Sequence, residues 1–148
     1  MMARICMRTA FLWVLAALLV GCLEGDARLL APQAARALLE SNAGKSDFLI
    51  LDVRTPEEFR QGYIEGAVLL DYHAPEFRER FAELDRAATI FLYCRSGNRS
   101  SSALGLADKL GFKRVFELKG GIRAWAEAGL PLARDNADPK GPSGPPPS

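Results

Sequence analysis

Two nearly continuous apolar runs mark the interior of the chain, at residues 48–53 and 89–93. Runs of this length are typical of strands that are buried on both faces of a parallel sheet. Shorter apolar segments at residues 67–70 and 114–118 predict further strands. We therefore expect a mainly parallel central sheet of about five strands.

Segments with helical spacing alternate with these strands. Residues 34–40 follow Pro32, which suits the first turn of a helix. The stretch 98–110 places four apolar side chains on one helical face and ends before Gly111, namely Ala103, Leu106, Ala107 and Leu110. Residues 75–84 and 121–128 predict two more helices. Strands that alternate with helices predict an α/β domain with helices flanking the sheet.

The first 21 residues differ from this pattern. A short basic region with Arg4 and Arg8 precedes an apolar run at residues 11–20, which is the order found in a secretory signal peptide. The run has about half of the ~20 residues that a membrane-spanning helix needs. It ends in Leu-Val-Gly-Cys at residues 19–22, which resembles a bacterial lipobox. That resemblance implies cleavage before Cys22 and lipidation of its thiol; a conventional signal cleaved a few residues later is the alternative.

These segments divide the chain into four parts. We expect a signal peptide at residues 1–21, a lipidated anchor and linker at 22–27, a folded domain at 28–133 and a disordered tail at 134–148. The tail holds five of the nine prolines and two glycines. Leu23, not aspartate, follows the anchor cysteine, so the outer membrane is slightly favoured over the inner one. The domain would then be a membrane-anchored lipoprotein that lies on the periplasmic face, outside the cytoplasm.

Composition narrows the function classes. The chain has 148 residues, 25% of them charged, and a formal net charge of +1, which fits one globular domain and gives no reason to expect a nucleic-acid partner. Removing residues 1–21 leaves 17 basic against 18 acidic residues and also removes Cys6. If Cys22 is lipidated, Cys94 is the one free thiol. A disulfide framework and a C-x-x-C redox motif are then both excluded, and we expect a monomer.

Cys94 stands between a buried strand and a helix start, followed by a polar and basic segment. Ligands of open α/β sheets bind at the carboxyl ends of the strands, and a helix start favours an anion. With Arg95 and Arg99 nearby, this environment should lower the pKa of the thiol. Gly97 allows a tight loop whose amides turn toward the sulfur. The alternative is that Cys94 fills the end of a core strand, as free cysteines often do, but the residues that follow it suit a core poorly.

Four segments of the chain resemble the rhodanese family over residues 28–133. They are Leu-Asp-Val-Arg-Thr-Pro-Glu-Glu-Phe at 51–59, Gly-Tyr-Ile-Glu-Gly-Ala at 62–67, Cys-Arg-Ser-Gly-Asn-Arg-Ser at 94–100 and Leu-Lys-Gly-Gly-Ile-Arg-Ala-Trp at 118–125. The resemblance implies a single-domain rhodanese-like fold and a thiosulfate sulfurtransferase. Cys94 would attack the outer sulfur of thiosulfate or of a polysulfide or persulfide donor and become a persulfide. A thiol or cyanide would then remove that sulfur.

The resemblance also implies roles for the residues around Cys94. Those of the loop would bind the substrate, with backbone amides holding the transferred sulfur, and they are Arg95, Ser96, Gly97, Asn98, Arg99 and Ser100. The partners would be a small anionic sulfur donor, an external thiol acceptor and, through Cys22, a membrane; no cofactor and no metal are needed. Asp52 and Arg54 would support the site structurally, and Arg99 has the alternative of facing inward and tying down the loop.

Six further residues complete this interpretation. Tyr63 and Glu65 replace the histidine and proline that the family usually has in this segment, and so affect local detail more than activity. His73, the only histidine, is expected at the surface or in a cap. Trp125 and the Gly120-Gly121 pair are expected to pack a helix and to form its tight lead-in.

Three other functions stay open at this point. In a cysteine phosphatase the phosphate-binding arginine comes six residues after the cysteine, whereas here Ser100 has that position and arginine comes at five. A non-catalytic, membrane-tethered binding module would not need the intact nucleophile. A thiol redox protein would lack its resolving cysteine within the chain.

Overall fold

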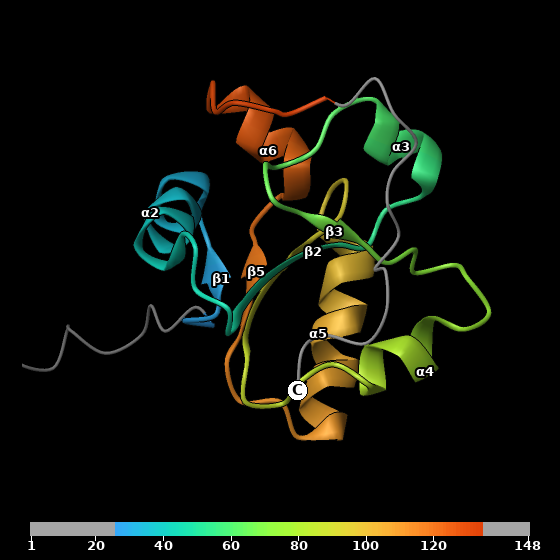
Figure 1. The fold of residues 1–148 in the computed structure, drawn as a ribbon. Coiled ribbons are helices and arrows are strands. Elements are labelled where there is room, and N and C mark those ends of the chain that lie inside the picture. Colours follow the sequence, from blue (N-terminus) through green and yellow to red (C-terminus); the bar gives the residue numbers. More distant parts are fainter. Residues whose placement is uncertain (1–25, 135–148) are drawn as a thin grey trace, which may run out of the picture.

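The computed structural model describes residues 26–134, which fold into one α/β layer structure (Figure 1). The strands are β1 Leu29–Leu30, β2 Phe48–Asp52, β3 Val68–Leu69, β4 Thr89–Tyr93 and β5 Val115–Leu118. The helices are α2 Pro32–Asn42, α3 Pro56–Arg60, α4 Phe77–Ala82, α5 Asn98–Leu110 and α6 Gly121–Glu127. The five strands form one sheet in the order β1-β5-β4-β2-β3, and every neighbouring pair is parallel. The expected fold class is confirmed.

The central strand β4 shows why the sheet is buried on both faces. Its residues alternate between the two sides, so that Ile90 and Leu92 join one apolar cluster while Phe91 and Tyr93 join the other. All four are buried. Helices α4 and α5 contribute side chains to the first cluster, and α2 and α6 contribute to the second. A helix layer therefore covers each face of the sheet.

Helix α5 begins and ends where local signals predict. Gly97 precedes it with φ 111° and Gly111 follows it with φ 84°, and glycine adopts both conformations at little cost. Its buried residues include Ala103 and Ala107, which face the first cluster. The helix therefore leads directly away from the carboxyl end of β4.

Two short elements were not predicted from the sequence. Strand β1 has two residues and is held by the edge of β5, whose Glu117 amide donates to the Arg28 carbonyl at 2.7 Å. Helix α3 has five residues and begins with a capping box between Thr55 and Glu58. The segment that departs from the family pattern follows α3. There Tyr63 stacks on Phe59, with ring centroids 4.2 Å apart.

Several predictions concern residues that the structure does not describe. The signal peptide at 1–21 and the lipidated Cys22 lie outside the described residues, as does the tail from residue 135 onward. Within residues 26–134, no helix has the length and apolar character needed to cross a membrane.

Candidate active site

Three neighbouring strands bring polar or reactive side chains to one edge of the sheet. Cys94 directly follows β4, Asp52 ends β2, and Glu117 lies near the end of β5. Because β4 lies between β2 and β5 and all run parallel, these residues meet at the carboxyl edge. The registers pair Asp52 with Tyr93 and Glu117 with Leu92. Because side chains alternate along a strand, Glu117 lies on the same face of the sheet as Cys94, and Asp52 lies on the other face with Tyr93.

The sulfur of Cys94 is buried, with 1% of the residue exposed, and it lies among hydrogen-bond donors. The amide of Gly97 donates to it over 3.1 Å, and the hydroxyl of Ser100 lies 3.4 Å away. Burial alone would raise the pKa of the thiol, but the Ser100 hydroxyl and the amides of Ser100, Gly97 and Ser96 outweigh burial and lower this pKa. The loop therefore favours the thiolate, which is the nucleophilic form.

Helix α6 holds the loop through its own backbone. The amide of Ile122 donates to the Cys94 carbonyl at 2.9 Å, and the amide of Arg123 donates to the Arg95 carbonyl at 3.2 Å. This close approach requires a glycine at the start of the helix. A Cβ atom on Gly121 would lie 2.5 Å from the Cys94 carbonyl oxygen, and its φ of 63° is itself unfavourable for other residues. The expected tight lead-in at Gly120-Gly121 is confirmed. The backbone of the Cys94 loop also packs directly against it.

On the opposite side of the site, Asp52 and Arg54 form a buried ion pair. Their side chains are 0% and 5% exposed, and Arg54 donates to both carboxylate oxygens at 2.6 to 2.9 Å. Arg54 also donates to the carbonyls of Glu58 and Gly62. Burial lowers the pKa of Arg54, but the hydrogen bonds and charge of Asp52 outweigh it and leave this pKa raised. Arg54 thus ties the end of β2 to α3 and to the turn that follows α3.

Arg99 makes a second ion pair, between the loop and α3. Its two terminal nitrogens donate to the two carboxylate oxygens of Glu58 at 2.7 and 2.8 Å. This hydrogen bonding is the main reason that the pKa of Glu58 lies at about 2 rather than at its usual 4.5. Only 18% of the Arg99 side chain is exposed. The structure therefore places Arg99 inward, against α3, in the alternative orientation considered from the sequence.

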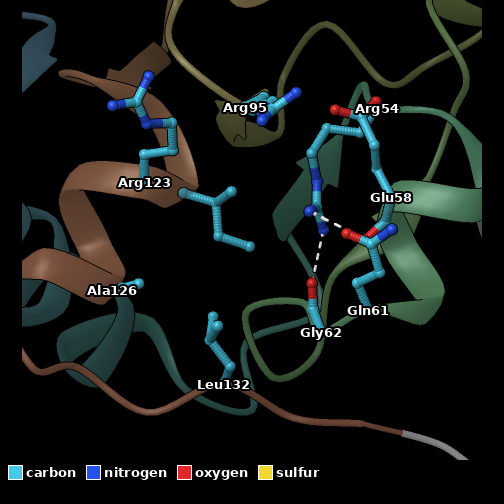
Figure 2. A pocket seen from close by; sticks show the side chains of 9 residues that line it. Arg54, Glu58, Gln61, Gly62, Arg95, Arg123, Ala126 and Leu132 are labelled. Atoms are coloured by element: carbon cyan, nitrogen blue, oxygen red, sulfur yellow. Dashed lines mark hydrogen bonds between the residues drawn. The ribbon is translucent and has the colours of Figure 1, made fainter.

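The loop side chains that face outward are Arg95, Ser96 and Asn98. Arg95 lines an open pocket of about 440 Å³ beside the loop, and Arg123 of α6 lines it too. Figure 2 shows these two cations near one end of the pocket and Ala126 and Leu132 near the other. The complete lining is Arg54, Glu58, Gln61, Gly62, Arg95, Ile122, Arg123, Ala126 and Leu132. The pocket thus offers cations and an apolar wall to a ligand that approaches the loop.

Glu117 is the residue of this site that sequence reasoning missed most clearly. It is 2% exposed, and its carboxylate accepts hydrogen bonds from Ser100 at 2.6 Å and from Ser101 at 2.9 Å. The available signal was a single acidic residue inside an apolar run. Glu58 was also missed, although Thr55 and Glu58 have the spacing of a capping box.

The remaining predicted residues lie as follows. His73 is exposed, and its ring stands edge-on to Tyr72 at 5.6 Å. Trp125 is buried in the second apolar cluster and donates to the Pro131 carbonyl. Glu65 is exposed. Among residues 26–134 no group of three or more histidine, cysteine or acidic side chains is arranged to hold a metal ion.

The chain is similar to several known proteins. It is 40% identical over 96 residues to "Sulfurtransferase" of Allochromatium vinosum, an alignment that covers 65% of this chain and 88% of the relative. It is 34% identical over 96 residues to "Thiosulfate sulfurtransferase GlpE" of Pseudomonas aeruginosa, which covers 65% of this chain and 81% of that protein. The fold matches the rhodanese-like domain of the Anabaena protein Alr3790 with a TM-score of 0.62 and 29% identity, over 79% of this chain and 86% of that one.

The rhodanese-like domain matches residues 32–128, which include Cys94, its loop and both ion pairs. Relatives that are named sulfurtransferases support sulfur transfer at the level of the family. Because this domain matches residues 32–128, the chain belongs to the rhodanese-like family.

Proposed function

We propose that this protein is a sulfurtransferase that carries sulfane sulfur as a persulfide on Cys94. The observation that carries the proposal is the buried Cys94 sulfur, which the loop surrounds with donors that lower its pKa. A thiolate held in this way is both a nucleophile and a leaving group. Sulfur transfer needs both properties from the same atom, one in each half-reaction.

In the first half-reaction, the Cys94 thiolate attacks the outer sulfur of thiosulfate. A sulfur–sulfur bond forms to Cys94, the sulfur–sulfur bond of the donor breaks, and sulfite leaves with its electron pair. In the second, cyanide or a thiolate attacks the outer sulfur of the persulfide. The bond to Cys94 then breaks and returns its electron pair to the Cys94 sulfur. Since Cys94 is the free cysteine of residues 26–134, we assign the second half-reaction to an external acceptor.

The pocket beside the loop supports an anionic donor. Arg95 and Arg123 both line it, and Arg95 is exposed and makes no ion pair among the described residues. An exposed guanidinium next to the reactive loop can attract and orient the sulfonate-like end of thiosulfate. Polysulfide and persulfide donors are anions as well, and we include them in the same substrate class.

Phosphatase chemistry receives less support from the same geometry. Arg99 is the arginine that follows Cys94 at the spacing nearest to that of a phosphatase loop, and its terminal nitrogens are both bound to Glu58. Donors that a phosphatase loop would offer to phosphate oxygens are thus engaged in this ion pair. The backbone amides of a short loop suit a single sulfur atom better.

Turnover measurements test the proposal. With thiosulfate and cyanide, the full chain should form thiocyanate with ping-pong kinetics, because the two half-reactions share one covalent intermediate. Cys94→Ser should abolish turnover while leaving the thermal unfolding transition in place. Hydrolysis of an aryl phosphate without thiosulfate turnover would contradict the proposal. So would a folded wild-type protein that transfers no sulfur from any of the three donors, which would favour a binding module.

The N-terminal sequence supports placing this reaction on a membrane surface outside the cytoplasm. Residues 1–22 have the basic region, the apolar run and the terminal Cys22 of a lipoprotein signal. In a bacterial host, the protein should fractionate with membranes and carry acyl chains on Cys22. Cys22→Ser should release it into the soluble fraction; retention of that variant on membranes would contradict the anchor.

A further inference from the structure

Glu117 is a buried acidic residue that the reaction above does not use. Its carboxylate lies on the same side of β5 as the sulfur-bearing loop and binds the first turn of α5, through Ser100 and Ser101. Among residues 26–134, no lysine, arginine or histidine nitrogen lies within 4.0 Å of it. A buried carboxylate without a cationic partner is costly. This cost calls for a functional explanation.

The hydroxyl of Ser100 connects Glu117 to the nucleophile. Its oxygen lies 2.6 Å from the Glu117 carboxylate and 3.4 Å from the Cys94 sulfur. The Gly97 carbonyl, 3.0 Å away, is a third acceptor for this hydroxyl. A hydroxyl has one hydrogen, so it can donate fully to only one of the three groups at a time. The distances favour the carboxylate, because charged O–H···O hydrogen bonds of 2.5 to 2.7 Å are the strong ones. Glu117 and the Cys94 sulfur therefore compete for the same hydrogen.

We propose that Glu117 is a positioning residue that acts on Cys94 through Ser100. By drawing the shared Ser100 hydrogen toward itself, Glu117 weakens the hydrogen bond of this hydroxyl to the sulfur and keeps the thiolate less stabilised than the loop could make it. Other charges around the sulfur come from the loop itself, where Arg95 is exposed and Arg99 is bound to Glu58 of α3. Among residues 26–134, Glu117 is the acidic residue whose carboxylate shares a hydrogen-bonding hydroxyl with Cys94.

This arrangement affects the two half-reactions in opposite directions. A less stabilised thiolate is a stronger nucleophile, and the same thiolate is a poorer leaving group. Glu117 therefore favours loading of sulfur onto Cys94 over its discharge. This consequence rests on the proposed function, whereas the effect of Glu117 on the Cys94 thiol can be measured without any sulfur transfer.

The test compares wild type with Glu117→Gln, a weaker acceptor, and Glu117→Leu, which has no acceptor. The Cys94 pKa is measured from the pH dependence of iodoacetamide alkylation, read by mass spectrometry on the Cys94 peptide. Releasing the Ser100 hydrogen to the sulfur should lower this pKa by about one unit, and further in the Leu than in the Gln variant. With Brønsted coefficients of about 0.4–0.5, loading by saturating thiosulfate should slow about threefold, while discharge by cyanide should become faster.

Matched variants separate this route from its alternatives. In a Ser100→Ala background the Gln and Leu variants should have the same Cys94 pKa, because the shared hydroxyl is gone. Ser101→Ala removes another partner of Glu117 and should change the Cys94 pKa less than Glu117→Gln does. If the Gln and Leu variants still differ without Ser100, Glu117 does not act through Ser100. An unchanged or raised Cys94 pKa in folded Glu117→Gln would overturn the proposal, as would equal slowing of both half-reactions.

Discussion

The Cys94 loop is held on its two sides by different kinds of contact. Toward α3 the contacts are between charged side chains, namely Arg99 with Glu58 and, behind them, Arg54 with Asp52. Toward α6 they are hydrogen bonds from helix amides to the carbonyls of Cys94 and Arg95. The α3 side thus depends on charge, and the α6 side depends on the absence of a single Cβ atom.

This difference teaches how the site can be sensitive to some changes and tolerant of others. Charged contacts respond to pH and to loss of one partner. Backbone contacts do not titrate, but they require two chains to approach so closely that only glycine fits. The two sides can therefore be broken separately, and each should fail in its own way.

The largest effect should follow from breaking the buried pair on the α3 side. Asp52→Asn leaves the Arg54 guanidinium buried without its counter-charge, which should cost about 3–5 kcal/mol of unfolding free energy. Urea unfolding measures this loss. The double variant Asp52→Leu with Arg54→Met removes both charges and should lose less. A single variant as stable as wild type would show that the charge of this pair does not hold the α3 side.

On the α6 side, Gly121→Ala should have the next largest effect. The new methyl group overlaps the carbonyl of Cys94 and the positive φ adds strain, for a total of about 2–4 kcal/mol. Gly129 is the matched control, since it has a similar φ of 72° but nothing within 4 Å of a Cβ atom. Gly129→Ala should therefore lose only about 1–2 kcal/mol and keep its sulfur transfer. Equal losses in the two variants would contradict the packing role of Gly121.

The partly exposed ion pair should give a smaller and pH-dependent effect. The pKa of Glu58 is about 2 in the folded protein and 4.5 ordinarily, so its stabilisation is present above pH 4.5 and is lost as the pH falls toward 2. Glu58→Gln should cost about 0.5–1 kcal/mol at neutral pH, and this difference should vanish across that window. Glu57→Gln, one residue away and more exposed, is the control for helix effects. If Glu58→Gln and wild type still differ in unfolding free energy as the pH approaches 2, the charge of Glu58 is not the cause of the difference.

The smallest effect on stability should come from Arg95, because its side chain takes part in neither set of contacts. Arg95→Ala should leave the free energy of unfolding unchanged. It should raise KM for thiosulfate severalfold, which corresponds to the loss of about one charged hydrogen bond to the donor. KM for an uncharged sulfur donor should change less. Arg78→Ala, an exposed cation on α4, should change neither. The same increase for both donors would show that Arg95 does not recognise the donor's charge.

The parts of the fold that depend on local signals could be predicted from the sequence. The apolar run of β4, Gly97 and Gly111 together fix the strand, the turn and the length of α5. The location of Cys94 at the carboxyl edge follows from that order. Helix α3 and strand β1 were missed because five and two residues are too few to show a period.

The division of labour within the site depends on contacts between distant residues. Arg95 and Arg99 stand four residues apart and look alike in the sequence. Only the approach of Glu58, 41 residues before Arg99, turns one of them inward. In the same way, Glu117 gains its place beside Ser100 because β5 and β4 are neighbours in the sheet. Such pairings come from topology, which the chain builds after its local elements.

The most direct test of the central claim is the mass of the Cys94 peptide after the full-length protein has been incubated with thiosulfate. The account predicts a gain of about 32 Da, one sulfur atom, on Cys94 of the wild type. Cyanide should remove it, and Cys94→Ser should not acquire it. A wild-type Cys94 that stays unmodified with thiosulfate, polysulfide and persulfide donors would contradict the account.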